Sequence, residues 1–412
     1  MTRPDPLPSD SDPQQPDWAL PSDQAGGLTP PAEQPVAAAA VPEAPAPPAP
    51  PAPPPPPPEP VVVPINWLVD NGSPPIVYRT LLELARVSPV PEKLASLIYS
   101  YSPAIMLAVS QRPEGTWNNA MLAVPAPRST DFEGVGTIVA YRRLLEYGWD
   151  RDAPPLFHAR RMLFRLLAED NDPNLLFEMA EKGKTDEDTV RRSRVLLREA
   201  AAAALAQAGY EGDPRLRGAA LRLLYRVTSF IRSPLAADAW VGAQGKRTLA
   251  PGAAPPSYFF LLMLAYMPLF RLEHASEMDD LLKYLTNSAG EASHGSHGGS
   301  QRYVVTGDPL GSEEVVQGDI AFAVSWLELT ARLGFLKRHG SWSAIFTSLL
   351  EQCDELAVWR ARRGQTLSRP GHAFVWPSFP LAANVSPDDQ AGDVTFRLAM
   401  IGRYSGRPVQ VV

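Results

Sequence analysis

The sequence has only one cysteine, Cys353, in 412 residues. A lone cysteine excludes an internal disulfide and any metal site built from several thiolates, and it fits a reducing compartment. The chain also lacks a long apolar run. Its most apolar segment, 258–270, is shorter than the roughly 20 residues of a membrane-spanning helix and contains Pro268. We therefore expect a buried core helix at 258–270, no transmembrane segment, no secretory signal and a cytoplasmic location.

The folded part of the chain has no excess of charge of either sign. The first 64 residues contain 8 of the 45 acidic residues but only one of the 38 basic residues, Arg3. Residues 65–412 therefore hold 37 residues of each sign, and the formal charge of −7 belongs to the N-terminal segment. Nucleic-acid binding usually requires a basic patch. We expect no nucleic-acid partner.

Proline is concentrated in residues 1–64, which hold 23 of the 46 prolines. This acidic Pro/Ala-rich composition cannot bury enough apolar surface to fold, so it predicts a disordered tail. The run Pro51–Pro60 favours polyproline II. Such a run serves either as a docking site for a protein partner of the SH3 or WW kind or as a spacer. The sequence leaves both roles open.

The remaining segment, 65–412, is predicted to be all-α. Helical stripes of apolar residues recur along it, and no segment shows a clear alternation of the strand type. Three stretches share a pattern of glycine, amphipathic helix and closing glycine: 134–148, 318–334 and 392–406. We predict a helix in each of them, and a long flexible loop at 286–315.

Gln111, Gly115 and Trp117 follow an apolar run with the spacing Gln-x-x-x-Gly-x-Trp. This spacing resembles the QW motif of the terpenoid cyclase and protein prenyltransferase superfamily, although Met106 stands where the family usually has an aromatic residue. The segment WLVDNGSPPIVYRTL at 67–81 is similar to bacterial proteins that carry prenyltransferase/squalene oxidase (squalene cyclase) repeats. The resemblance covers 65–412 and is strongest over 65–149. It implies an α/α-toroid of paired helices in which Gln111 and Trp117 link one pair to the next.

The catalytic signature of that superfamily does not accompany the resemblance. No Asp-x-Asp-Asp run is present, and the nearest acidic cluster is formed by Asp388, Asp389 and Asp393. Neighbouring carboxylates can hold a proton or a hard cation, so these three are the catalytic candidates, and a loop followed by a helix start is the structural alternative. Asp279 and Asp280 are interpreted as the acidic start of a helix.

No cofactor or metal is expected. Cys353-Asp354 has the reverse order of the Asp-x-Cys zinc pair of the prenyltransferases, and His372 follows too closely. His294 and His297 stand in a Gly/Ser-rich segment that does not fix a metal geometry. The chain contains no nucleotide-binding, nucleophile-elbow or metalloprotease motif.

The toroid resemblance implies a central cavity. We expect its wall to contain four aromatic residues, which could equally be core residues: Trp326, Phe374, Trp376 and Phe379. The first functional hypothesis is therefore binding of an apolar, isoprenoid-like small molecule. The alternative is a helical-repeat scaffold that binds a protein through its Pro-rich tail. An isoprenoid enzyme would need acids facing the cavity, and the sequence does not decide whether a reaction occurs.

Overall fold

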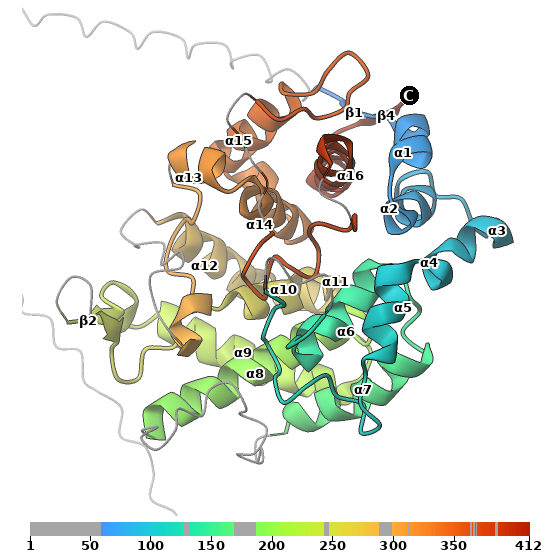
Figure 1. Cartoon of the computed structure of the whole chain (residues 1–412). Coiled ribbons are helices and arrows are strands. Elements are labelled where there is room, and N and C mark those ends of the chain that lie inside the picture. Colours follow the sequence, from blue (N-terminus) through green and yellow to red (C-terminus); the bar gives the residue numbers. More distant parts are fainter. Residues whose placement is uncertain are drawn as a thin grey trace, which may run out of the picture. The chain divides into compact units, whose positions relative to one another are not determined.

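The computed structural model describes residues 59–126, 132–168, 187–242, 247–287, 299–311, 313–362, 365, 367, 369–383 and 386–412. They belong to one unit, which spans 57–412. This unit is mainly helical, as predicted (Figure 1). Its α-helices are, in chain order, α1 (Ile65–Asn71), α2 (Pro74–Arg79), α3 (Glu92–Ala95), α4 (Leu97–Ser100), α5 (Ser102–Val109), α6 (Thr137–Glu146), α7 (Pro154–Leu166), α8 (Glu187–Gln207), α9 (Pro214–Ile231), α10 (Tyr258–Ala265), α11 (Pro268–Glu273), α12 (Ala275–Thr286), α13 (Glu313–Gly318), α14 (Ile320–Arg332), α15 (Gly340–Leu350) and α16 (Pro387–Ser405).

The shorter elements join these helices. A π-helical turn continues α2 at Thr80–Leu84, and 3-10 turns lie at Pro234–Ala236, Gly299–Tyr303 and Leu336–Arg338. The short strands are β1 (Val61–Val63), β2 (Trp240–Val241), β3 (Thr248–Leu249) and β4 (Val409–Val411). Within the predicted loop 286–315, residues 288–298 lie outside the described part. His294 and His297 are among these residues, so their predicted lack of a fixed metal geometry is not described.

Two of the three helices predicted from glycine positions begin and end as expected. α6 follows Gly136, and Gly148 closes it with a φ of 89°, a left-handed conformation that suits glycine. α14 follows Asp319, whose carboxylate accepts a hydrogen bond from the Phe322 N–H, and Gly334 closes it with a φ of 77°. Their boundaries therefore follow from local capping chemistry.

The third prediction was wrong at its start. α16 begins at Pro387, so Gly392 lies inside the helix and does not open it. Ser386 is the N-cap, and its hydroxyl accepts a hydrogen bond from the Asp389 N–H. A serine cap followed by proline in the first turn is a stronger start signal than glycine. Gly406 closes the helix, as expected.

The tail predicted at residues 1–64 is too long, because residues near its end form the strand β1. Val61–Val63 pairs in parallel with Val409–Val411, and Val61 and Val63 are buried. Val61 packs against Gly402 of α16, where an added Cβ would lie 2.8 Å from Val61 Cγ1. The strand therefore forms through contacts with the far end of the chain, which the local composition does not reveal.

The middle of the unit is formed by α8 and α10, which pack against each other. Every residue of α10 is buried, and the alanines at 200–204 of α8 are fully buried. Small side chains on α8 allow the large side chains of α10 to approach. The buried core helix predicted at 258–270 is confirmed over Tyr258–Ala265, but Pro268 starts the separate helix α11, in which Leu269 is 61% exposed.

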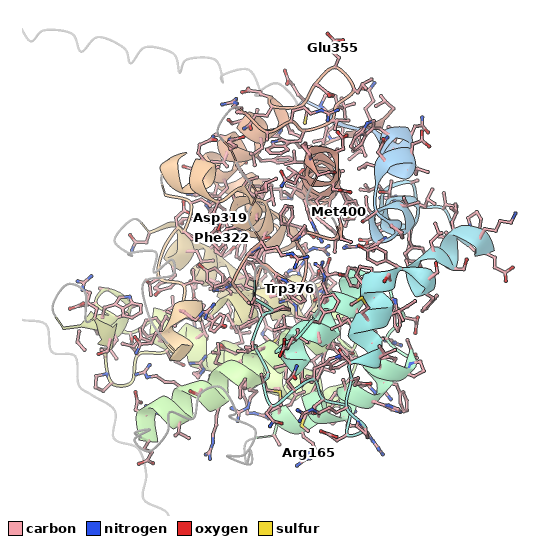
Figure 2. The ribbon with its side chains drawn as sticks, in the orientation of Figure 1. Arg165, Asp319, Phe322, Glu355, Trp376 and Met400 are labelled. Atoms are coloured by element: carbon pink, nitrogen blue, oxygen red, sulfur yellow. The ribbon has the colours of Figure 1, made fainter. Side chains whose placement is uncertain are left out.

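The first and last helices of the unit are neighbours. α1 and α2 both contact α16, and α16 packs along α14 (Figure 1). In Figure 2, Trp376 and Phe322 are surrounded by other side chains, whereas Arg165 and Glu355 lie at the periphery. In the ranges that the structure describes, no helix is both long enough and apolar enough to cross a bilayer.

Candidate functional site

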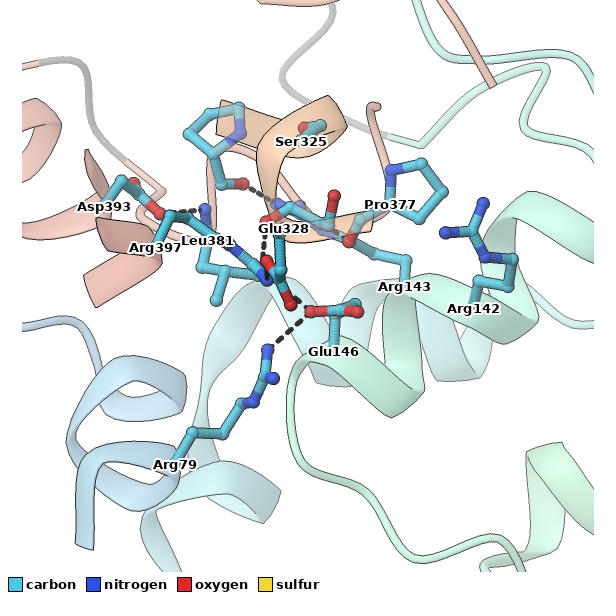
Figure 3. Close-up of polar contacts among 12 residues, drawn as sticks. Arg79, Arg142, Arg143, Glu146, Ser325, Glu328, Pro377, Leu381, Asp393 and Arg397 are labelled. Carbon is cyan, nitrogen blue, oxygen red and sulfur yellow. Dashed lines mark hydrogen bonds and ion pairs between the residues drawn. The ribbon is translucent and has the colours of Figure 1, made fainter. Parts of the chain in front are cut away.

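A group of paired arginines and glutamates lies buried where α2, α6, α14 and α16 meet (Figure 3). We call it the Arg–Glu cluster, and it consists of Arg79, Glu146, Glu328, Arg332 and Arg397. None of these side chains is more than 8% exposed. Charged side chains are rarely buried to this extent unless they are paired.

Glu146 and Glu328 are bridged by Arg397. Its Nη2 donates to Glu146 Oε2 at 2.8 Å, and its Nη1 donates to Glu328 Oε2 at 3.0 Å. Arg79 donates to the same oxygen of Glu146. Arg332 approaches Glu328 Oε1 with two nitrogens, at 2.9 and 2.7 Å. Four helices are thus joined by one chain of charge-assisted hydrogen bonds.

The arginines keep both glutamates ionised. Burial alone would raise the pKa of Glu146, but Arg79 and Arg397 hold that pKa far below its ordinary value. Burial would also raise the pKa of Glu328, but Arg397 and Arg332 lower that pKa below its ordinary value. Removing one partner of a buried pair leaves a charge without compensation and typically costs about 3–5 kcal/mol. The Arg–Glu cluster therefore fixes the relative positions of α2, α6, α14 and α16.

Further buried charges hold the irregular segment 373–382 against the cluster. Arg143 donates to the carbonyl oxygens of Trp376 and Pro377, at 3.1 and 3.2 Å, and to that of Pro380. Asp393 accepts hydrogen bonds from the backbone N–H groups of Leu381 and Ala382. An irregular segment can be buried only if its backbone polar groups find partners. These side chains supply them.

A cavity of about 430 Å³ opens beside the Arg–Glu cluster. Arg79, Glu146 and Arg332 line it together with Glu83 of the π-helical turn and Gln207 of α8. Its remaining wall includes four aromatic side chains: Tyr78, Trp149, Tyr266 and Tyr404. The cavity therefore presents charged groups of both signs between aromatic walls.

A second, much smaller cavity lies within the cluster. It has a volume of about 20 Å³ and shares Glu146, Tyr266 and Arg332 with the first cavity. Arg142 and Arg397 also line it. A cavity of this size holds about one water-sized particle.

A third cavity, of about 210 Å³, lies between α8, α9 and the segment 249–257. Most of its wall is apolar, but Glu199 of α8 is part of it. Glu199 accepts a hydrogen bond from the Ser257 hydroxyl at 2.6 Å and pairs with Arg226. Burial is the largest influence on this carboxyl and raises the pKa of Glu199 above its ordinary value.

The three acidic candidates from the sequence do not form one group. Asp388 is exposed and pairs with Arg360 at 3.1 Å, and Asp389 is half-buried and accepts a hydrogen bond from the Ser386 hydroxyl. Asp393 is only 1% exposed and holds the backbone of segment 373–382. Burial raises the pKa of Asp393 to about 6, despite its two backbone hydrogen bonds and nearby arginines. The three residues are close in the sequence, but they occupy different positions on α16 and therefore lie in different environments.

The four aromatic candidates are buried, and they are distributed over different contacts. Trp326 and Phe374 both pack on Tyr258, with ring centroids 6.0 and 4.9 Å apart. Arg143 lies over the ring of Trp376 at 5.0 Å, and Phe379 is 1% exposed. Phe374 lines the 20 Å³ cavity, whereas Trp376 lines a separate cavity of about 60 Å³.

The Gln-Gly-Trp motif lies between helices α5, α6 and α7. The Gln111 amide donates to the carbonyl of Pro155 at 2.8 Å, and Trp117 Nε1 donates to that of Leu107 at 2.8 Å. The backbone N–H of Trp117 donates to the Thr137 hydroxyl at 3.0 Å. These contacts join three successive helices. Membership of the terpenoid cyclase superfamily stays a prediction.

The remaining polar candidates are engaged in local contacts. Asp279 and Asp280 lie within α12 and do not start it, contrary to the prediction. Asp279 pairs with Arg338, and Asp280 pairs with Arg232. Burial raises the pKa of the Cys353 thiol to about 11. Among the described residues, no group of three or more His, Cys, Asp or Glu side chains is placed to hold a metal ion.

Sequence reasoning missed the Arg–Glu cluster entirely. One signal was present: Glu328 is the only charged residue of the mostly apolar run Ile320–Leu329, and a charge on a buried helix requires a partner. Arg332 is a local partner, four residues along the same helix, but the second partner, Arg397, is 69 residues away and is not encoded locally. Neither a protein-family model, nor a curated protein, nor a solved structure matches the chain. The cytoplasmic location also stays a prediction.

Proposed function

We propose that the helical unit is a small-molecule-binding domain of the α/α-toroid kind, and that its ligand is polar. The observation that carries this proposal is the 430 Å³ cavity lined by Glu146, Arg79 and Arg332. Ligand sites of proteins are typically cavities of about 300–1,000 Å³ with a few fixed polar groups. Here the polar groups are held by the buried ion pairs before any ligand arrives, which lowers the cost of organising the site.

The contacts between the first and last helices support the toroid part of the proposal. A ring of helices has to bring its two ends together, and α1 and α2 contact α16. The pairing of β1 with β4 joins the same two ends of the unit. Successive helices also pack on one another along the chain, as α5 on α6, α6 on α7 and α7 on α8.

The composition of the cavity wall indicates the class of ligand. Three arginines and three acidic residues line it: Arg79, Arg151, Arg332, Glu83, Glu146 and Asp150. These groups already pair with one another or with the backbone, but a hydrocarbon would displace the water from their remaining hydrogen-bonding positions and offer nothing in return, which is costly. A molecule with both hydrogen-bond donors and acceptors could replace that water, and the aromatic side chains would pack against its flat or apolar parts. The ligand is therefore a polar or zwitterionic compound.

The π-helical turn Thr80–Leu84 also supports a ligand at this position. π-Helical turns are rare and occur frequently at functional sites. This turn brings Glu83 to the wall of the cavity, where it pairs with Arg79, and Leu82 to the rim. Leu82 is 41% exposed. It is thus a position where the cavity can be blocked without disturbing the core.

The test uses the full chain purified from the producing cells. Native mass spectrometry and extraction would identify bound small molecules in the wild-type protein, in Leu82→Trp and in Leu235→Trp. Leu235 is 39% exposed and does not line the 430 Å³ cavity, so it is a matched control. We expect a polar compound in the wild type and in Leu235→Trp, and a loss of at least about tenfold in occupancy in Leu82→Trp.

Two results would contradict the proposal. One is a bound compound that Leu82→Trp retains as well as the wild type. The other is a wild-type protein that carries no compound and whose melting temperature is unchanged by every member of a polar-metabolite library. A ligand bound only to the folded protein must raise its stability.

The apolar, isoprenoid-like ligand expected from the sequence is the second candidate, and the Glu199 cavity favours it. Val195, Leu196 and Leu249 give this 210 Å³ cavity an apolar wall, and Glu199 is the acid that faces it. Ala254→Trp would narrow this cavity, since Ala254 is part of its lining and partly exposed. Extraction of a lipid that is lost in Ala254→Trp but kept in Leu82→Trp would favour this candidate.

The scaffold hypothesis concerns the Pro-rich tail, whose residues 1–58 lie outside the described part. It stays a prediction. A pull-down with the full chain, compared with a variant that lacks residues 1–58, would test it directly. A partner that requires those residues would support docking through the tail, whereas equal recovery of every partner would favour the spacer role.

A further inference from the structure

Arg142 is a buried cation without an acidic partner. It lies on α6 and is 2% exposed, yet it forms no ion pair with any carboxylate of the described residues. The other arginines that line the 20 Å³ cavity, Arg332 and Arg397, each pair with Glu328, and Arg397 also pairs with Glu146. Figure 3 shows Arg142 beside the Arg–Glu cluster with no dashed line to another residue drawn.

The hydrogen bonds of Arg142 all go to neutral acceptors. Its Nε donates to Gln207 Oε1 at 2.9 Å, and its Nη1 donates to the carbonyl oxygens of Ala373 and Phe374 at 3.2 and 3.5 Å. Its Nη2 makes no hydrogen bond to the residues that the structure describes. Burial lowers the pKa of Arg142 to about 10, although Tyr266 and Glu146 oppose this shift.

The two glutamates that line the 20 Å³ cavity with Arg142 already accept hydrogen bonds on both of their oxygens. Glu146 Oε2 accepts from Arg79 and Arg397, and Glu146 Oε1 accepts from the Gln207 amide at 2.6 Å. Both oxygens of Glu328 are occupied by Arg332 and Arg397. Gln207 therefore stands between Arg142 and Glu146, so that Arg142 contacts an amide where the other arginines contact a carboxylate.

The 20 Å³ cavity lies against this uncompensated charge. Three arginines line it, Arg142, Arg332 and Arg397, but only two acids, Glu146 and Glu328. Its lining thus carries one excess positive charge. A buried charge without a partner is costly, and the volume suffices for one small particle.

We propose that this cavity binds one monovalent inorganic anion, such as chloride or bromide, which pairs with Arg142. The anion neutralises the excess charge of the lining and accepts hydrogen bonds from the N–H groups of Arg142 Nη2. It completes the charge balance between α6, α14 and segment 373–382, so its role is to stabilise the fold. The anion proposal does not rest on the ligand proposed for the 430 Å³ cavity, although the two cavities share Glu146, Tyr266 and Arg332.

The experiment measures the melting temperature of the full chain at constant ionic strength, while chloride or bromide replaces gluconate, which is too large for the cavity. We expect a saturable rise of about 2 °C or more in the wild type. Arg142→Met should abolish the rise, since it removes the charge with little change in length. Arg217→Met is the control, because Arg217 lies outside the lining of the cavity, is 34% exposed and pairs with Glu273, and it should keep the full halide dependence.

A halide dependence that does not saturate, or that Arg142→Met retains, would overturn the proposal. If Arg142→Met does not fold, anomalous diffraction from crystals of the wild type grown in bromide decides the question. A bromide peak within hydrogen-bonding distance of Arg142 supports the proposal, and a cavity that holds only water overturns it.

Discussion

Arg397 and Glu146 are 251 residues apart in the chain, and they form an ion pair of 2.8 Å in which neither side chain is more than 3% exposed. Arg397 comes from the last helix of the unit and Glu146 from α6. Their pairing fixes the last helix against a helix from the first half of the chain. It also shapes the wall of both cavities beside Glu146.

We expect Glu146→Gln to destabilise the protein by about 3 kcal/mol or more, because it leaves Arg79 and Arg397 buried with one negative charge fewer. Urea unfolding of the full chain measures the loss. Asp152→Asn is the control: Asp152 is 61% exposed and pairs with Arg160 at 3.3 Å. A surface pair of this kind contributes less than about 1 kcal/mol. Equal effects of the two substitutions would contradict the structural role of the Arg–Glu cluster.

Asp393 should make the stability of the protein depend on pH. Burial raises its pKa from the ordinary 3.8 to about 6, so the folded state binds a proton more tightly than the unfolded state. The resulting contribution is fully present below the unfolded pKa and is lost as the pH rises through about 6. The full effect is about 3 kcal/mol, since each pKa unit corresponds to about 1.4 kcal/mol.

Comparison of the wild type with Asp393→Asn isolates this contribution, because both proteins share the acid sensitivity of Glu146 and Glu328. The stability difference between them should fall between about pH 4 and pH 7. Asp354→Asn is the control, since hydrogen bonds from Arg360 and the backbone outweigh burial and lower the pKa of Asp354, which moves its titration below this range. A constant difference for Asp393→Asn would show that Asp393 does not titrate as described.

Gly115→Ala tests the close approach of the Gln-Gly-Trp motif to α7. Gly115 has a φ of 89°, and an added Cβ would lie 2.9 Å from the carbonyl oxygen of His158. Gly134 also has a positive φ, of 76°, but an added Cβ would meet nothing within 4 Å. Both alanines carry a backbone penalty of about 1 kcal/mol. We expect Gly115→Ala to cost about 1–3 kcal/mol more, measured by urea unfolding, and similar losses would argue against a tight contact.

Gly402 and Gly392 make a matched pair within α16. An added Cβ at Gly402 would lie 2.8 Å from Val61 Cγ1, whereas at Gly392 the nearest atom, Trp67 Cζ3, is 4.0 Å away. Gly392→Ala should stabilise the protein by about 0.5–1 kcal/mol, as alanine favours a helix interior. Gly402→Ala should destabilise it by about 1 kcal/mol or more, because β1 has to move. Thermal unfolding distinguishes the two signs, and stabilisation by both would mean that β1 does not pack on α16.

Several features of the fold follow from the sequence alone. Asp319 and Gly334 bound α14 by capping chemistry that acts within a few residues. The apolar composition of 258–270 predicts a buried helix, which the structure contains at Tyr258–Ala265. Other features could not be predicted locally. The composition around Val61–Val63 predicts a continuation of the Pro-rich tail, and only the pairing with Val409–Val411 makes it a strand. The separation of Asp393 from Asp388 and Asp389 depends on which face of α16 meets segment 373–382.

The candidate site is the part that only the tertiary structure decided. The sequence by itself determined that the chain is mainly helical, because helix periodicity and capping are local properties of neighbouring residues. It did not determine that Arg79, Glu146, Glu328 and Arg397 would meet, because their helices are far apart along the chain. A buried charge is tolerated only with a partner, and the partner is chosen by packing in space.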